Sequence, residues 1–190
     1  MRKLLARAWL RLTGWAPEGE LPAAAHFVLI AAPHTSNWDL AYLLALAEVY
    51  GLRVSWMGKH TLFRPPLGAL FRALGGIPIR RHERGDRVAV MAAEFALRER
   101  FALVVPSEAT RSWAPYWKSG FYHIARRAGV PIVLGFLDYR RRRGGFGPSL
   151  VPTGDVAKDM NAIRAFYADK VGKHPDQFGP VRLREEGGPE

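Results

Sequence analysis

The chain of 190 residues contains no cysteine. This absence excludes a disulfide framework, a thiolate metal site and a cysteine-linked acyl intermediate, and it suits a cytosolic protein. Long apolar runs are also missing, since the best one, Leu40 to Ala47, falls short of the roughly 18 apolar residues that span a membrane. The start resembles a signal peptide, but Arg7 and Arg11 interrupt the apolar segment that such a peptide requires. We therefore expect neither a membrane span nor secretion.

Acidic residues are in short supply. Asp and Glu number 17 against 28 Lys and Arg, which leaves a net charge of +11. Such an excess favours a polyanion, an anionic membrane face or an acidic substrate as the partner. The six histidines show neither an HExxH motif nor paired-ligand spacing, so we expect no metal and no bound cofactor.

Strand and helix patterns alternate along the chain. This alternation predicts a single α/β domain built on a mixed, largely parallel sheet flanked by helices. Strands are expected at 27–32, 53–57, 77–81, 101–105 and 131–139, and helices at 38–50, 86–100, 119–128 and 156–171. The predicted domain covers residues 23–172.

The two ends of the chain have patterns of their own. Residues 1–15 predict an amphipathic helix with an apolar arc opposite a cationic face; the arc consists of Leu4, Leu5, Ala8, Trp9 and Leu12. This helix either packs on the domain's own core or lies on anionic lipid. Residues 173–190 are rich in Pro and Gly, and we expect a loosely ordered tail.

One candidate catalytic pair follows the first buried strand, where His34 precedes Asp39 by five positions. In a continuous helix these side chains would not face each other, so His34 must still be in the loop while Asp39 lies in the first helical turn. Pro33 disfavours helix before His34, and residues 35–37 offer N-cap side chains. A carboxylate on one ring nitrogen leaves the other free to act as a general base.

This His-x4-Asp block resembles the first motif of the glycerolipid acyltransferases, the lysophosphatidate acyltransferase (PlsC-like) family. Three further blocks of that family occur in order: Gly75 to Arg81, Pro106 to Ser112, and Ala128 to Val133. The resemblance spans roughly residues 26 to 140 and indicates a compact branch of the family. It implies that His34 and Asp39 are catalytic and that the acceptor is bound by Arg81, Arg80, Lys59, Glu108, Thr110 and Arg111.

The third block departs from the family pattern twice. Ser107 stands where proline is usual, and Ala109 replaces a glycine. If that position requires a positive φ, alanine is strained there.

The resemblance implies transfer of a fatty acyl group from acyl-CoA or acyl carrier protein to the hydroxyl of a lysophospholipid similar to 1-acylglycerol-3-phosphate, in phospholipid biosynthesis. The lack of cysteine, the lack of a membrane span and the cationic amphipathic helix lead us to expect a cytoplasmic enzyme attached peripherally to the inner face of the cell membrane. Two alternatives remain open. A thioesterase would use the same histidine with water as acceptor, although Gly-x-Ser-x-Gly is absent. A nucleic-acid-binding protein would account for the charge but not for His34 and Asp39, and no nucleic-acid partner is expected.

Overall fold

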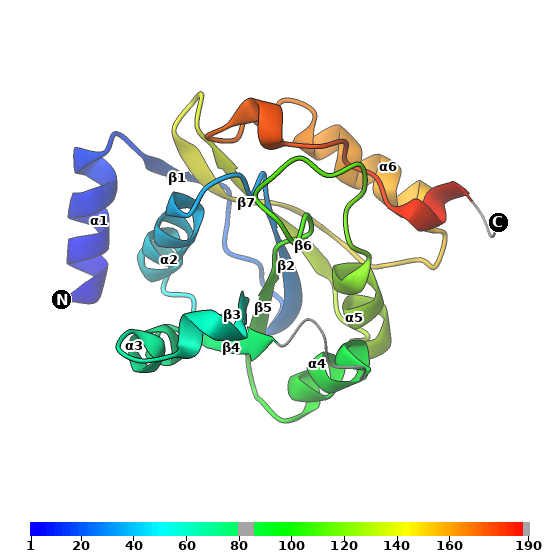
Figure 1. Cartoon of the computed structure of the whole chain (residues 1–190), viewed down its shortest axis with the longest axis horizontal. Coiled ribbons are helices and arrows are strands. Elements are labelled where there is room, and N and C mark those ends of the chain that lie inside the picture. The colour runs from blue at the N-terminus through cyan, green and yellow to red at the C-terminus, as the bar shows by residue number, and fades with distance from the viewer. Residues whose placement is uncertain (80–85, 188–190) are drawn as a thin grey trace.

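A computed structural model describes residues 1–79 and 86–187. It contains a seven-stranded sheet with helices on both faces (Figure 1). The strands are β1 Ala16–Glu18, β2 His26–Ala32, β3 Val54–Lys59, β4 Gly76–Ile79, β5 Phe101–Val105, β6 Ile132–Asp138 and β7 Arg143–Leu150. The α-helices are α1 Arg2–Leu12, α2 Trp38–Tyr50, α3 Gly68–Ala73, α4 Arg87–Ala96, α5 Gly120–Ala128 and α6 Val156–Tyr167. The predicted α/β class with a mixed, largely parallel sheet is confirmed.

The sheet order β1-β7-β6-β2-β5-β3-β4 places β2 near the centre. Strands β6, β2, β5, β3 and β4 run parallel, and β7 returns antiparallel to β6. Parallel strands bring their carboxyl ends to one edge of a sheet, which is where open α/β sheets bind ligands. The loops after β2, β5, β6 and β3 therefore start close together, although they are far apart in the sequence.

The core has a layer on each side of the sheet. Alternate residues of β2 and β5, such as Ile30 and Leu103, face α4, α5 and α6, while Phe27 and Leu29 face the side of α2 and α3. Every residue of β5 is buried, as a continuous apolar run in a parallel sheet predicts. Three elements were not expected from the sequence: strands β1 and β7 and helix α3.

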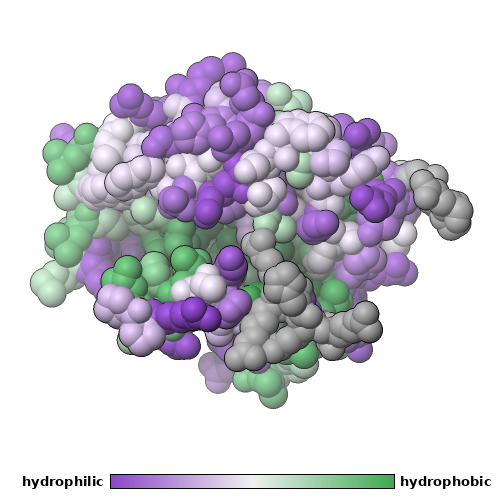
Figure 2. All heavy atoms as spheres, viewed as in Figure 1, coloured by the Kyte–Doolittle hydropathy of each residue, from purple (hydrophilic) through white to green (hydrophobic). Residues whose placement is uncertain are grey.

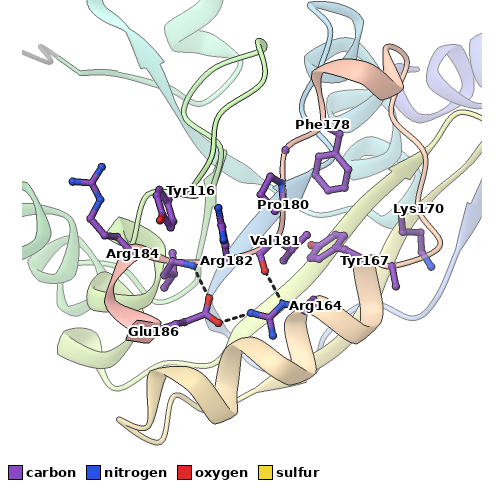
Figure 3. Close-up of a pocket in the computed structure, with 13 residues that line it drawn as sticks. Tyr116, Arg164, Tyr167, Lys170, Phe178, Pro180, Val181, Arg182, Arg184 and Glu186 are labelled. Carbon is purple, nitrogen blue, oxygen red and sulfur yellow. Dashed lines mark hydrogen bonds and ion pairs between the residues drawn. The ribbon is translucent and has the colours of Figure 1, made fainter. Parts of the chain in front are cut away.

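Within the described residues the C-terminal segment is ordered, where a loosely ordered tail was expected. Val181 and Leu183 are buried, and Leu183 forms a β-bridge with Trp117. In Figure 3, Arg164 of α6 donates to the Val181 carbonyl and forms an ion pair with Glu186. Pro and Gly in this segment therefore shape turns between anchored apolar side chains.

Helix α1 packs on α2 through a face that shares Trp9 with the predicted apolar arc but is otherwise formed by other residues. Ala6 and Leu10 are buried, whereas Leu4, Leu5 and Leu12 are 68%, 65% and 86% exposed. Figure 2 shows hydrophobic side chains at the edge of the molecule where Figure 1 places α1. The helix thus packs with one face and leaves Leu4, Leu5 and Leu12 of the apolar arc in solvent, whereas Trp9 of the arc stacks on Tyr42.

Candidate active site

His34 lies in the loop between β2 and α2, and Asp39 lies in the first turn of α2. The structure brings the two side chains together, with Nδ1 of His34 3.2 Å from Oδ2 of Asp39. Asn37 is the N-cap of α2 but makes no side-chain cap, and the Asp39 carboxylate instead accepts from the Ser36 amide at 2.8 Å. Asp39 is 4% exposed and the His34 side chain 23%, so the imidazole is the partner that solvent and substrate can reach.

Tyr139 is a further neighbour of this pair, and it was not among the residues singled out from the sequence. It follows β6, which lies next to β2, and its hydroxyl donates to Oδ1 of Asp39 at 2.6 Å. Burial and the Asp39 carboxylate raise the pKa of Tyr139 well above its usual value. The phenol therefore remains a donor throughout the physiological range.

Glu108 supports the loop that carries His34. It follows β5, which pairs in parallel with β2, and its Oε1 accepts from the His34 backbone amide at 2.6 Å. The resemblance implies contact between Glu108 and substrate, but the side chain is 3% exposed and is directed at the loop. Its position favours a supporting role over contact with the acceptor.

The Glu108 carboxyl has a pKa raised to about 8. Burial is the main cause and repulsion from Asp39 adds to it, while the hydrogen bond from the His34 amide opposes both. Near pH 7 the group is therefore mostly a neutral acid. It supplies an oxygen acceptor to the His34 loop without a second buried negative charge beside Asp39.

This raised pKa predicts that Glu108 makes the protein less stable as pH rises. Between about pH 4.5 and pH 8 the folded protein retains a proton that the unfolded chain has lost, so the free energy of unfolding falls across this window and levels off above it. At about 1.4 kcal/mol per pKa unit, the total is about 3–5 kcal/mol. Glu108→Gln keeps the acceptor but cannot ionise, so we expect a flatter profile.

Urea unfolding of both proteins from pH 5 to pH 9 measures this difference. The stability of Glu108→Gln relative to the native protein should increase with pH up to about 8. Parallel profiles would show that the carboxyl is not held neutral by the fold.

Ala109 has a φ of 53°, in the left-handed region. Its amide donates to the Pro106 carbonyl at 3.0 Å, so the chain makes a tight turn at this point. An alanine in this conformation costs about 1–2 kcal/mol, a strain that glycine would avoid. The left-handed conformation explains why glycine is usual at this position in the family. This chain makes the same turn with alanine instead.

A channel of about 950 Å³ runs past His34. Its apolar wall includes one face of α2, with residues at helical spacing: Leu40, Leu43, Leu44 and Ala47. The channel continues to Tyr50 and Leu52 at the far end of α2, a helix of about 20 Å. Figure 2 shows a hollow with hydrophobic walls on this side of the molecule.

Polar groups line the same channel. Lys59, at the end of β3, and Arg111, in the loop after β5, are exposed, and Thr110 lies beside Arg111. The channel thus combines an imidazole, two cations and a long apolar wall. Arg80 and Arg81, to which the resemblance gives the phosphate, lie outside the described residues.

A second pocket, of about 640 Å³, lies between α6 and the C-terminal segment (Figure 3). Arg182 and Arg184 lie over the Tyr116 ring at 4.6 Å and 5.4 Å. The site residues expected from the sequence and placed by the structure do not line it. The channel beside His34 is therefore the candidate active site.

Together, the fold and the channel define an α/β protein in which an imidazole paired with a carboxylate lies beside a long apolar channel that is also lined by two cationic side chains. The chain belongs to the acyltransferase family, whose model, described as Acyltransferase, matches residues 17–133. Comparison with curated proteins gives no match.

Among solved structures, the chain is similar to the crystal structure of the 1-acyl-sn-glycerophosphate (LPA) acyltransferase PlsC from Thermotoga maritima. The TM-score is 0.57 at 17% identity, with 80% of this chain and 68% of that chain covered. At this identity the likeness shows a shared fold. The resemblance carried by the four sequence blocks is thus confirmed for family and fold.

Proposed function

We propose that the protein transfers a fatty acyl group from acyl-CoA or acyl carrier protein to the hydroxyl of a lysophospholipid similar to 1-acylglycerol-3-phosphate, in phospholipid biosynthesis. The observation that carries this proposal is the position of His34, against Asp39 and beside an apolar channel whose wall also holds Lys59 and Arg111. An acyl chain suits the apolar wall, and a phosphate suits the cations.

The chemistry follows from the two ring nitrogens of His34. With Nδ1 directed at Asp39, Nε2 is free to accept the proton of the acceptor hydroxyl as that oxygen attacks the thioester carbonyl. The tetrahedral intermediate then collapses, the carbon–sulfur bond breaks, and the thiol leaves with the proton returned by the imidazolium. Asp39 stabilises the imidazolium between these two proton transfers.

Acyl transfer and the alternative hydrolysis differ in the acceptor, which is a lysolipid hydroxyl in the first reaction and water in the second. Thiol release from acyl-CoA and from acyl carrier protein should be measured with and without 1-acylglycerol-3-phosphate. We expect release to depend on the lysolipid, since His34 requires a hydroxyl positioned by the cations. Equal release without lysolipid would instead favour a thioesterase.

We further propose that the enzyme works at the inner face of the cell membrane, attached through α1. Leu4, Leu5 and Leu12 form an exposed apolar arc beside the cationic residues Lys3 and Arg7. This combination is typical of helices that lie on anionic lipid. None of the helices in the described part of the chain combines the length and the apolar character that a membrane span requires.

Replacing both Leu4 and Leu5 with Asp should weaken binding to vesicles containing phosphatidylglycerol by about tenfold or more, because two leucine side chains that insert into the lipid are lost. Vesicle co-sedimentation measures the change. Leu97→Asp is a matched control, since Leu97 is 76% exposed but follows α4, on the opposite face of the sheet. Unchanged binding by the double variant would contradict attachment through α1.

A further inference from the structure

The Asp39 carboxylate is buried, and its two oxygens have different partners. Oδ2 accepts from the Ser36 amide and lies 3.2 Å from Nδ1 of His34. Oδ1 accepts from the Tyr139 hydroxyl at 2.6 Å, and within residues 1–79 and 86–187 no other hydrogen bond to Oδ1 is present. A buried carboxylate oxygen without a donor is unfavourable, so the Tyr139 bond to Oδ1 and the Ser36 bond to Oδ2 together set how the carboxylate is rotated.

Tyr139 is itself held firmly. Its ring packs edge-on against Trp15 at 4.9 Å and against Tyr42 at 5.9 Å. Its backbone amide donates to the Val171 carbonyl at 2.8 Å. The aromatic neighbours come from the segment after α1 and from α2, so three separate parts of the chain place one hydroxyl.

We propose that Tyr139 is a positioning residue of the active site: by fixing Oδ1 of Asp39, it holds Oδ2 toward Nδ1 of His34 and so keeps Nε2 as the basic nitrogen. The contribution to turnover rests on the proposed function. The effect on the imidazole does not, because it concerns the protein without substrate. Tyr139 contacts neither substrate nor reacting atoms in this role.

Removing only the hydroxyl tests the proposal. Tyr139→Phe keeps the ring between Trp15 and Tyr42, and loss of a hydrogen bond to a charged group should lower kcat by about 10–100-fold with the KM for both substrates unchanged. The matched control is Tyr122→Phe, because the buried Tyr122 hydroxyl donates to Asp159 at 2.7 Å on the α5–α6 side. This control removes the same type of bond and should leave kcat within twofold of the native value.

Two more measurements separate positioning from a general structural effect. In an Asp39→Asn background, adding Tyr139→Phe should change kcat less than threefold, since both changes act on one interaction. Nitrogen-15 NMR of the substrate-free protein should show His34 protonated at Nδ1, with the Nε2-protonated form increasing in Tyr139→Phe; His34→Ala assigns the signal.

An unchanged imidazole tautomer in Tyr139→Phe would overturn the proposal. A kcat loss of equal size in the Asp39→Asn background, or in Tyr122→Phe, would overturn it as well. If the native protein transfers no acyl group, the proposed function fails, and the NMR result still decides whether Tyr139 positions the pair.

Discussion

Acyl transfer by His34→Ala is expected to fall by about 10²–10⁴-fold, the usual contribution of a general base. His34 is the imidazole held by Asp39 beside the channel, so its loss leaves the acceptor hydroxyl without a proton acceptor. The apolar wall, Lys59 and Arg111 remain in place. Binding of the lysolipid should therefore persist while kcat collapses, as steady-state kinetics and a separate binding measurement can show.

His123→Ala is the control for this change. His123 is exposed on α5, on the other side of the sheet from the channel, and its removal should leave kcat unaltered. If His34→Ala turned over at near-native rate with a native melting temperature, His34 would not be the base.

Asp39→Asn should lower kcat by about 10²–10⁴-fold, the effect of removing the carboxylate that orients a catalytic histidine. Asp39 provides one oxygen facing His34 and another facing Tyr139. An asparagine amide can present its oxygen to either His34 or Tyr139, but its NH2 group then faces the other residue. The neutral amide also cannot stabilise an imidazolium. The KM for both substrates should change little, because Asp39 is 4% exposed.

Asp159→Asn separates this loss from simple destabilisation. Asp159 is also buried and also accepts from a tyrosine hydroxyl, that of Tyr122, but it lies in α6. We expect this variant to lose stability and keep its kcat. Comparable kcat losses in both aspartate variants would indicate a general effect on folding.

Much of the fold was predictable because apolar runs and helix signals were strong. The helix at 38–50 and the strand at 101–105 have the bounds that the sequence predicts. The placing of His34 in a loop also followed from Pro33 and from helical geometry. Local residues settle such features, so local patterns are sufficient to find them.

Other features depend on contacts between distant segments. Strand β7 is rich in glycine and follows an arginine run, so it has little strand signal of its own, and pairing with β6 defines it. The ordered C-terminal segment depends on Leu183 meeting Trp117. Tyr139 reaches Asp39 only because β6 lies beside β2, an order that the sequence does not reveal.

Product analysis by mass spectrometry tests the central claim most directly. The native protein is incubated with mixed lysolipids and with acyl-CoA and acylated acyl carrier protein that bear acyl chains of several lengths. The His34→Ala variant is incubated in the same way. The account predicts a new diacyl phospholipid, with one ester added to a phosphate-bearing lysolipid, formed by the native protein and lost in the variant. Free fatty acid as the sole acyl product, or the same diacyl lipid from both proteins, would contradict it.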